Sequence, residues 1–178
     1  LAGGILSIRQ GDFTETGLQL HQAMRVEADG DHDPARSRVQ ARDLLMPRSG
    51  AGALGKNRLA VYLGEERANI GCFVDLIRLR EINPFYVWLF LRSAPGWEQI
   101  KAAFNGVGTP NINFTEIRSL RIPLLAQEQQ LNIEHSYLRD VLHLHQAAMD
   151  VRQSAQAQSA FANLVCTLET QMRDASSS

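Results

Sequence analysis

The spacing of apolar residues changes once along the chain, close to Pro123. Ahead of that proline, apolar residues come in short runs bounded by glycine, proline and asparagine, a pattern typical of β-strands joined by turns. Asn83 and Pro84 form a good helix start, with a capping side chain and a first-turn proline. Strands and helices without regular alternation indicate an α+β fold with a mixed sheet. We expect strands at Ile5–Arg9, Arg42–Pro47, Leu59–Leu63 and Asn69–Leu79, and helices at Phe85–Arg92 and Gly96–Phe104.

Beyond Pro123 there is no further proline or glycine, and the pattern is helical from Glu128 to about Arg173. Two lines of residues with a seven-residue period form a heptad seam. We predict one coiled-coil helix over residues 126–174, roughly 70 Å long. A head domain of residues 1–125 is too small to cover this helix, and residues 175–178 read as a disordered tail. The expected dimer interface consists of Tyr137, Val141, Leu144, Ala148, Val151, Ala155, Ala162, Val165 and Met172.

The composition is that of an ordinary folded chain. Of the 178 residues, 44% are apolar and 21% are charged, and no apolar run approaches the ~20 residues of a membrane span. Cys72 and Cys166 follow no metal or redox spacing and lie in apolar surroundings. We therefore expect buried, reduced thiols in a cytoplasmic protein.

The formal charge of -1 is unevenly distributed along the chain. Residues 36–121 carry thirteen basic and seven acidic side chains, whereas both flanking segments are net acidic. An acidic loop at Glu27–Pro34 is expected to be exposed. Clustered positive charge is what a surface that binds a polyanion requires, although a solvated arginine-rich surface would give the same count.

The segment from Arg48 to Arg58 is a glycine-rich loop between two expected strands. It nearly matches a phosphate-binding P-loop, but Asn57 stands where magnesium binding requires Ser or Thr, and a strand is expected where a helix should follow. A flexible turn within a sheet is one interpretation. A DNA-facing loop is the other, because Arg48, Ser49, Lys56 and Arg58 bracket glycines that allow close backbone approach.

A second polar loop, Gly106-Val-Gly-Thr-Pro-Asn-Ile-Asn-Phe114, contains side chains that donate and accept hydrogen bonds. Asn111 has the chemistry to read adenine or to bind phosphate, and Thr109 and Asn113 have the same capacity more weakly. Both asparagines are equally suited to capping turns, including a helical start after Asn113. The complete set of candidate DNA-binding residues is Arg36, Arg38, Arg48, Ser49, Lys56, Arg58, Thr109, Asn111 and Asn113.

No arrangement typical of catalysis stands out. Asn83-Pro-Phe-Tyr86 lacks the second proline of the Asn-Pro-Pro-Tyr motif of amino-methyltransferases, and no glycine-rich adenosylmethionine-binding loop follows an early strand. The five histidines form no ligand set. We expect a chain without enzymatic activity, metal or cofactor of its own.

The order of three segments resembles a known family. The loop at Gly106 is followed by Leu120-Arg-Ile-Pro-Leu-Leu125, expected to be a strand, and by Gln127-Glu-Gln-Gln130 at a helix start. This order resembles the end of a target recognition domain in the specificity subunit of type I restriction-modification enzymes. The likeness covers roughly residues 39–133. Thr109 replaces the glutamine usual in the family, and the first 38 residues show little of its opening.

The resemblance implies a half-subunit with one recognition domain and one spacer helix. Such a chain would read half of a bipartite site in double-stranded DNA and dock methyltransferase (modification) subunits, which would bind the adenosylmethionine. A restriction subunit would join the same assembly. Two copies, or one copy and another specificity half, would pair through the helices. The rival functions are a coiled-coil scaffold with a protein-binding head and a P-loop-like nucleotide-binding protein.

Overall fold

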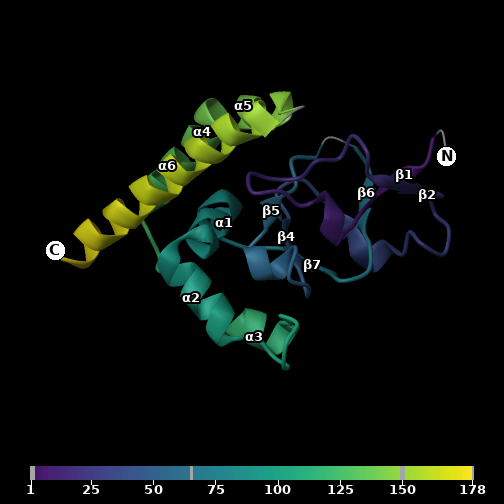
Figure 1. Cartoon of the computed structure of the whole chain (residues 1–178), viewed down its shortest axis with the longest axis horizontal. Helices are drawn as coiled ribbons and strands as arrows, with labels where there is room; N and C mark the ends of the chain where they lie inside the picture. Colours follow the sequence, from purple (N-terminus) through teal and green to yellow (C-terminus); the bar gives the residue numbers. More distant parts are fainter. Residues whose placement is uncertain (1–2, 65, 149–150, 178) are drawn as a thin grey trace. The chain divides into compact units, whose positions relative to one another are not determined.

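The computed structural model describes residues 3–64, 66–148 and 151–177, without the side chains of residues 151–153. Strands occupy the first part of the chain and helices the second (Figure 1). The described residues divide into two units, one of Leu1–Leu79 with Asn105–Asn113, the other of Arg80–Phe104 with Phe114–Ser178. The expected α+β class is confirmed. The division differs from the boundary predicted at residue 125, because the first helices pack with the C-terminal ones.

The first unit contains two small sheets of short strands. One has the order β2-β1-β6-β3, with β1 and β6 parallel and the other pairs antiparallel; the second is antiparallel, in the order β5-β4-β7. Three 3-10 turns, η1 (Gln10–Asp12), η2 (Ala35–Ser37) and η3 (Leu54–Lys56), lie between the strands. The strands are β1 (Ile5–Ile8), β2 (Met24–Val26), β3 (Arg38–Val39), β4 (Leu44–Pro47), β5 (Ala60–Val61), β6 (Ala68–Ile70) and β7 (Val74–Ile77).

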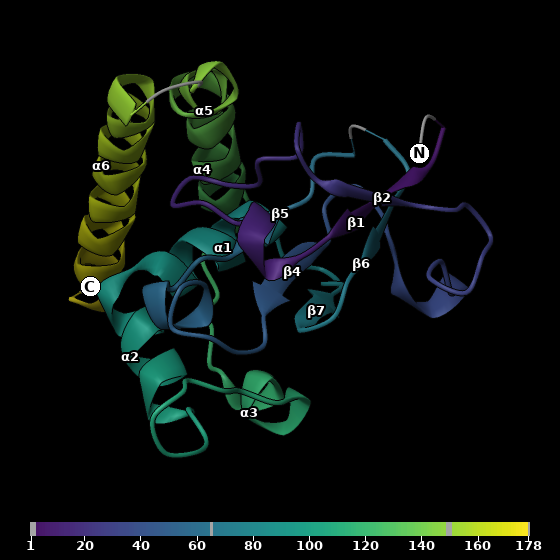
Figure 2. The same cartoon turned by 45° about the vertical axis from the view of Figure 1, so that its right-hand side comes forward.

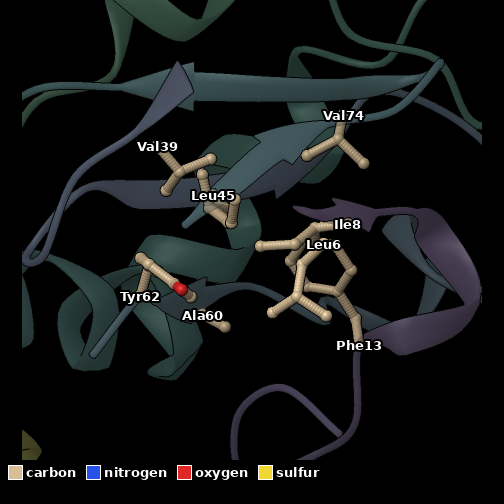
Figure 3. Close-up of a cluster of buried hydrophobic side chains, with 9 residues drawn as sticks. Leu6, Ile8, Phe13, Val39, Leu45, Ala60, Tyr62 and Val74 are labelled. Atoms are coloured by element: carbon tan, nitrogen blue, oxygen red, sulfur yellow. The ribbon is translucent and has the colours of Figure 1, made fainter. Parts of the chain in front are cut away.

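Residues from both sheets form one apolar core in this unit. Figure 3 shows these side chains gathered together, with Leu6 and Ile8 from β1 close to Phe13. Leu6, Ile8 and Leu45 are fully buried. The core therefore holds the two sheets together, and the turns at the strand ends are positioned by it. Its members are Leu6, Ile8, Phe13, Val39, Leu45, Ala60, Tyr62, Ala68 and Val74.

The second unit is helical, with α1 at its centre. Every residue of α1 from Pro84 to Leu91 is buried, as expected for a helix that is apolar on all sides. The Asn83 side chain caps it by accepting hydrogen bonds from the Phe85 and Tyr86 amides, as the sequence predicts. The helices are α1 (Pro84–Arg92), α2 (Ala94–Ala102), α3 (Phe114–Ser119), α4 (Gln127–Asp140), α5 (Leu142–Ala147) and α6 (Val151–Ser176).

The single helix predicted over residues 126–174 is wrong, because this segment forms α4, α5 and α6. α6 runs back along α4 and α5, and Figure 2 shows the two arms side by side. The physical reason is that Tyr137 of the predicted seam is buried within the chain: the rings of Trp88, Tyr137 and Phe161 contact one another in tilted or edge-on arrangements, with ring centroids 4.9–6.4 Å apart. α6 alone retains the long helical character, and it extends to Ser176, into the tail predicted to be disordered.

The strand expected at Leu120–Leu125 is also wrong, because the segment pairs with no strand. The side-chain amide of Gln99 instead makes the two hydrogen bonds that a neighbouring strand would make to Arg121, accepting from its N–H at 2.9 Å and donating to its carbonyl at 3.0 Å. The Tyr86 hydroxyl donates to the carbonyl of Pro123. These side chains satisfy the extended backbone in place of a sheet.

Candidate functional site

Two polar loops that are distant in sequence meet in the first unit. A β-bridge joins Ser49 to Asn111. The Gly50 N–H donates to the Pro110 carbonyl, and the Ile112 N–H donates to the Arg48 carbonyl, both at 3.0 Å. The candidate residues that the sequence places on separate loops therefore share one surface, which we call the loop surface and define as the exposed parts of residues 48–58 and 105–113.

Glycines shape the 105–113 loop. Gly106 and Gly108 have φ angles of +85° and +95°, in the left-handed region that favours glycine. The Asn105 N–H donates to the Asn111 carbonyl at 2.7 Å and closes the loop. The side chain of Ile112 is completely buried and anchors the loop on the unit. Thr109, Asn111 and Asn113 are exposed, and Asn113 stands immediately before α3, at the capping position that the sequence suggests as its alternative role.

The 48–58 loop contains η3 and leads directly into β5. Gly50 has a φ of +94°, and the Gly55 N–H donates back to the Gly50 carbonyl at 2.9 Å. Lys56 is exposed at the end of η3. A P-loop needs an α-helix after the loop, with amides directed at the phosphates, and β5 occupies that place. The geometry therefore gives no support to the nucleotide-binding alternative.

Most candidate arginines are engaged by carboxylates. The Arg48 Nε donates to the buried Asp75 at 3.0 Å, and the Arg58 Nε donates to Glu15 at the same distance. Asp75 raises the pKa of Arg48 by its hydrogen bond. The guanidinium of Arg48 is thus held in one orientation while its side chain remains 40% exposed. Such an arginine is oriented for contact with a ligand rather than mobile in solvent.

Arg38 lies in a cluster of opposite charges that includes no residue of the two loops. Its guanidinium donates to Asp29 at 2.7 Å and to the buried Asp33 at 3.1 Å. Asp33 also accepts from Arg67 at 2.5 Å and from Asn69 at 2.8 Å. The hydrogen bond from Arg38, followed by that from the Asp29 amide, holds the pKa of the Asp33 carboxyl well below its usual range. Because its charge is already compensated here, Arg38 is poorly suited to anchoring a phosphate.

Two of the predicted cations have no such partner. No carboxylate of the described residues pairs with the Arg36 guanidinium or the Lys56 ammonium, and both side chains are exposed. These two groups therefore carry net positive charge at the surface of the unit. The sequence alone does not distinguish them from Arg48 and Arg58, because the partners of those two arginines, Asp75 and Glu15, come from distant segments.

Gln10 and Phe73 belong to this region although the sequence singles out neither. The Gln10 side-chain amide donates to the Ser49 carbonyl at 2.9 Å and to the Phe73 carbonyl at 3.2 Å. The Arg48 N–H also donates to the Phe73 carbonyl, at 2.8 Å. Gly71, which interrupts the apolar run, is the one local signal of a turn before Phe73.

The residues of the predicted dimer interface differ in how deeply they are buried. Tyr137 and Val141 are buried against their own chain, which corrects their assignment to a partner. Ala155 and Ala162 are exposed, while the side chain of Val151 lies outside the described residues. Leu144, Ala148, Val165 and Met172 are half-buried, and the residues of α6 that are buried instead are Ala157, Phe161 and Leu168.

Both cysteines are exposed, contrary to the expectation of buried thiols. Cys72 lies in the turn between β6 and β7, and Cys166 lies on the outer side of α6. Apolar neighbours in sequence did not reveal the face on which each thiol lies. Within the described ranges, no group of three or more His, Cys, Asp or Glu side chains is placed to hold a metal ion, and no helix is long and apolar enough to cross a membrane.

Two comparisons with known proteins, one with protein families and one with curated proteins, found no match. The chain matches no protein-family profile, and no curated protein aligns with it significantly.

Proposed function

We propose that this chain is a non-catalytic DNA-recognition subunit, the specificity half-subunit of a restriction-modification enzyme of type I. The observation that carries the proposal is the junction of the two polar loops through Ser49 and Asn111. Hydrogen-bonding side chains on a fixed backbone are what reading the edges of base pairs requires. The sequence resemblance supports this class of DNA-binding protein, and the loop surface would be the place of contact.

The candidate residues of the loop surface, together with Arg36 outside it, divide by chemistry into those that would bind phosphate and those that would read base edges. Lys56 and Arg36, which have no carboxylate partner among the described residues, would bind phosphates. Asn111, with Thr109 and Asn113 beside it, would face base edges. Arg48, oriented by Asp75 and 40% exposed, would present its guanidinium to guanine or to phosphate, the two groups that arginine most often contacts in DNA.

The helical unit would serve the assembly. In this proposal, methyltransferase subunits carrying adenosylmethionine dock on the α4–α6 hairpin, and a restriction subunit completes the enzyme. A second copy, or a different specificity half, would pack through the exposed Ala155 and Ala162 of α6, because alanines allow helices to approach closely. Two-fold pairing would place two recognition surfaces on one DNA molecule.

Binding of fluorescent duplex DNA over a range of salt concentrations tests the proposal. The logarithm of the affinity should fall linearly with the logarithm of salt concentration, and Lys56→Ala should reduce that slope by about one unit. Lys101, the other lysine of the chain, is the matched control because it pairs with Glu98 in the helical unit. Lys101→Ala should leave the slope unchanged.

The competing function is a coiled-coil scaffold whose head binds protein. It predicts no salt-dependent affinity for DNA. An affinity that is undetectable at low salt, with the purified chain folded, would therefore favour the scaffold and reject DNA recognition.

A further inference from the structure

A cavity of about 820 Å³ opens in the first unit, beside the loop surface. Its size lies within the ~300–1,000 Å³ typical of sites for small ligands. Met24, Val26 and Ile70 give it an apolar wall, and Phe73 stands at its rim. Of the residues that line it, only Arg36 has a role in the proposed function, as a phosphate contact.

Phe73 is held at the rim in an unusual conformation. Its φ angle is +63°, in the left-handed region that is rare for a bulky residue, and its side chain is 62% exposed. Hydrogen bonds from the Arg48 N–H and the Gln10 side chain to its carbonyl maintain this backbone. Strain of this kind, together with an exposed aromatic ring, is typical of positions selected for binding rather than for stability.

Positively charged side chains line the same cavity as Phe73. Arg9 and Arg36 line the same cavity, with His32 beside them and Asp31 as the one lining carboxylate. Gly71 makes room for the Arg9 side chain, because a Cβ at this position would lie 2.8 Å from Arg9 Cγ. A ligand of this cavity would therefore have a flat apolar part for Phe73 and an anionic part for the two arginines.

We propose that the cavity binds a nucleotide of a DNA strand, with its unpaired base stacked on Phe73 and its phosphates near Arg9 and Arg36. Stacking on aromatic side chains is the common way of holding bases that have left the helix. This inference deepens the proposed function and rests on it for the source of the nucleotide. The proposed function includes contacts to the edges of paired bases. This inference adds a second kind of contact, in which one base leaves the stack of neighbouring bases and enters the cavity.

The exposed thiol of Cys72, which lines the cavity next to Phe73, provides a direct test. A mixed-sequence single-stranded oligonucleotide should slow the alkylation of Cys72 several-fold. The rate of alkylation is measured by peptide mass spectrometry. Cys166, which is also exposed and lies on α6, is the internal control and should react at an unchanged rate. Equal protection of both thiols, or of neither, would overturn the proposal.

Variants at Phe73 test whether a base stacks on this ring or whether the bound oligonucleotide only shields Cys72 from the reagent. Phe73→Ala should weaken oligonucleotide binding roughly 5- to 150-fold, whereas Phe73→Tyr should retain most of it. Leu124, which is 80% exposed in the helical unit, provides the control: Leu124→Ala should change nothing. A strand containing 5-iodouracil should form a photocrosslink to residue 73 in the unaltered protein. Crosslinking elsewhere together with an unchanged affinity of Phe73→Ala would reject the site.

Three further outcomes distinguish this inference from the proposed function. Salt-dependent duplex binding without protection of Cys72 would reject the cavity and leave DNA recognition standing. Protection by single strands without duplex binding would support the nucleotide site and reject recognition of double-stranded DNA. Equal protection by deoxyadenosine monophosphate at the same nucleotide concentration would retain the nucleotide chemistry but overturn its assignment to a strand.

Discussion

The two units of this chain are stabilised by different interactions. In the first, strands of two to four residues support long loops, and arginines at the surface pair with carboxylates that are almost completely buried, those of Asp33, Asp43 and Asp75. In the second, helices pack through an aromatic cluster around Trp88. Burial of aromatic rings is a non-directional source of stability, whereas each ion pair fixes one loop in one conformation.

This difference agrees with the roles that we propose for the two units, which are DNA recognition for the first and docking of other subunits for the second. Loops that read a ligand must hold defined conformations without a large core beneath them, and directional hydrogen bonds to buried carboxylates provide this. A unit that docks other subunits can rely on apolar packing. We therefore expect the units to respond differently to loss of an aromatic ring and to acid.

The largest effect is expected in the aromatic cluster. Trp88 is 1% exposed and contacts the rings of Phe85, Tyr137 and Phe161. Trp88→Ala should lower the free energy of unfolding by about 3–5 kcal/mol, measured by urea denaturation followed by circular dichroism. Trp97, the other tryptophan, is only half-buried, so Trp97→Ala should cost clearly less. Equal losses would contradict the central role given to Trp88.

Acid should affect the first unit through Asp33. The folded state lowers the pKa of this carboxyl, so its stabilising contribution is complete above the unfolded pKa of about 4 and is lost as the pH falls below it. Asp33→Asn should lower stability at pH 7 and flatten the decline between pH 5 and pH 2. Asp140→Asn, in an exposed pair with Arg139, is the control and should have little effect. A decline unchanged by Asp33→Asn would show that other groups cause it.

A smaller effect is expected at Tyr86 in the helical unit. Burial raises the pKa of its hydroxyl to about 12, so its contribution is complete below pH 10 and is lost as the pH rises from about 10 to about 12. Tyr86→Phe removes the hydrogen bond to the Pro123 carbonyl and should cost about 1 kcal/mol at neutral pH. The same variant should lose part of its sensitivity to alkali, and an identical alkaline midpoint would argue against ionisation of Tyr86 as a cause.

The sequence predicted those elements of the fold that depend only on neighbouring residues. The Asn83 cap, the apolar α1 and strand β4 are read directly from neighbouring residues. The division of this segment into α4, α5 and α6 left no local signal, because the sequence there has neither glycine nor proline and the pairing of α4 with α6 includes contacts between distant residues, such as Tyr137 and Phe161. For the extended segment at Leu120–Leu125, an apolar run looked like a strand, but it pairs with no strand of the described residues.

The candidate site was predicted only in part, because some of its features are local in sequence and others depend on tertiary contacts. The polar loops containing Ser49 and Asn111 could be recognised from their composition, and the structure joins them. Which arginines are already paired depends on contacts such as that between Arg48 and Asp75, 27 positions apart. The positions of Gln10 and Phe73 likewise depend on the tertiary fold, and the only local signal was Gly71, which marks the turn before Phe73.

Selection of duplexes from a random-sequence library tests the central claim most directly. The purified chain, alone and with any methyltransferase that co-purifies with it, should enrich one short motif. Asn111→Ala should lose preference at one position of that motif, at a cost of ~1–3 kcal/mol on the preferred sequence only. Lys56→Ala should weaken binding to all sequences alike. Enrichment of no motif, or the same motif and affinity after both substitutions, would contradict recognition of DNA by the loop surface.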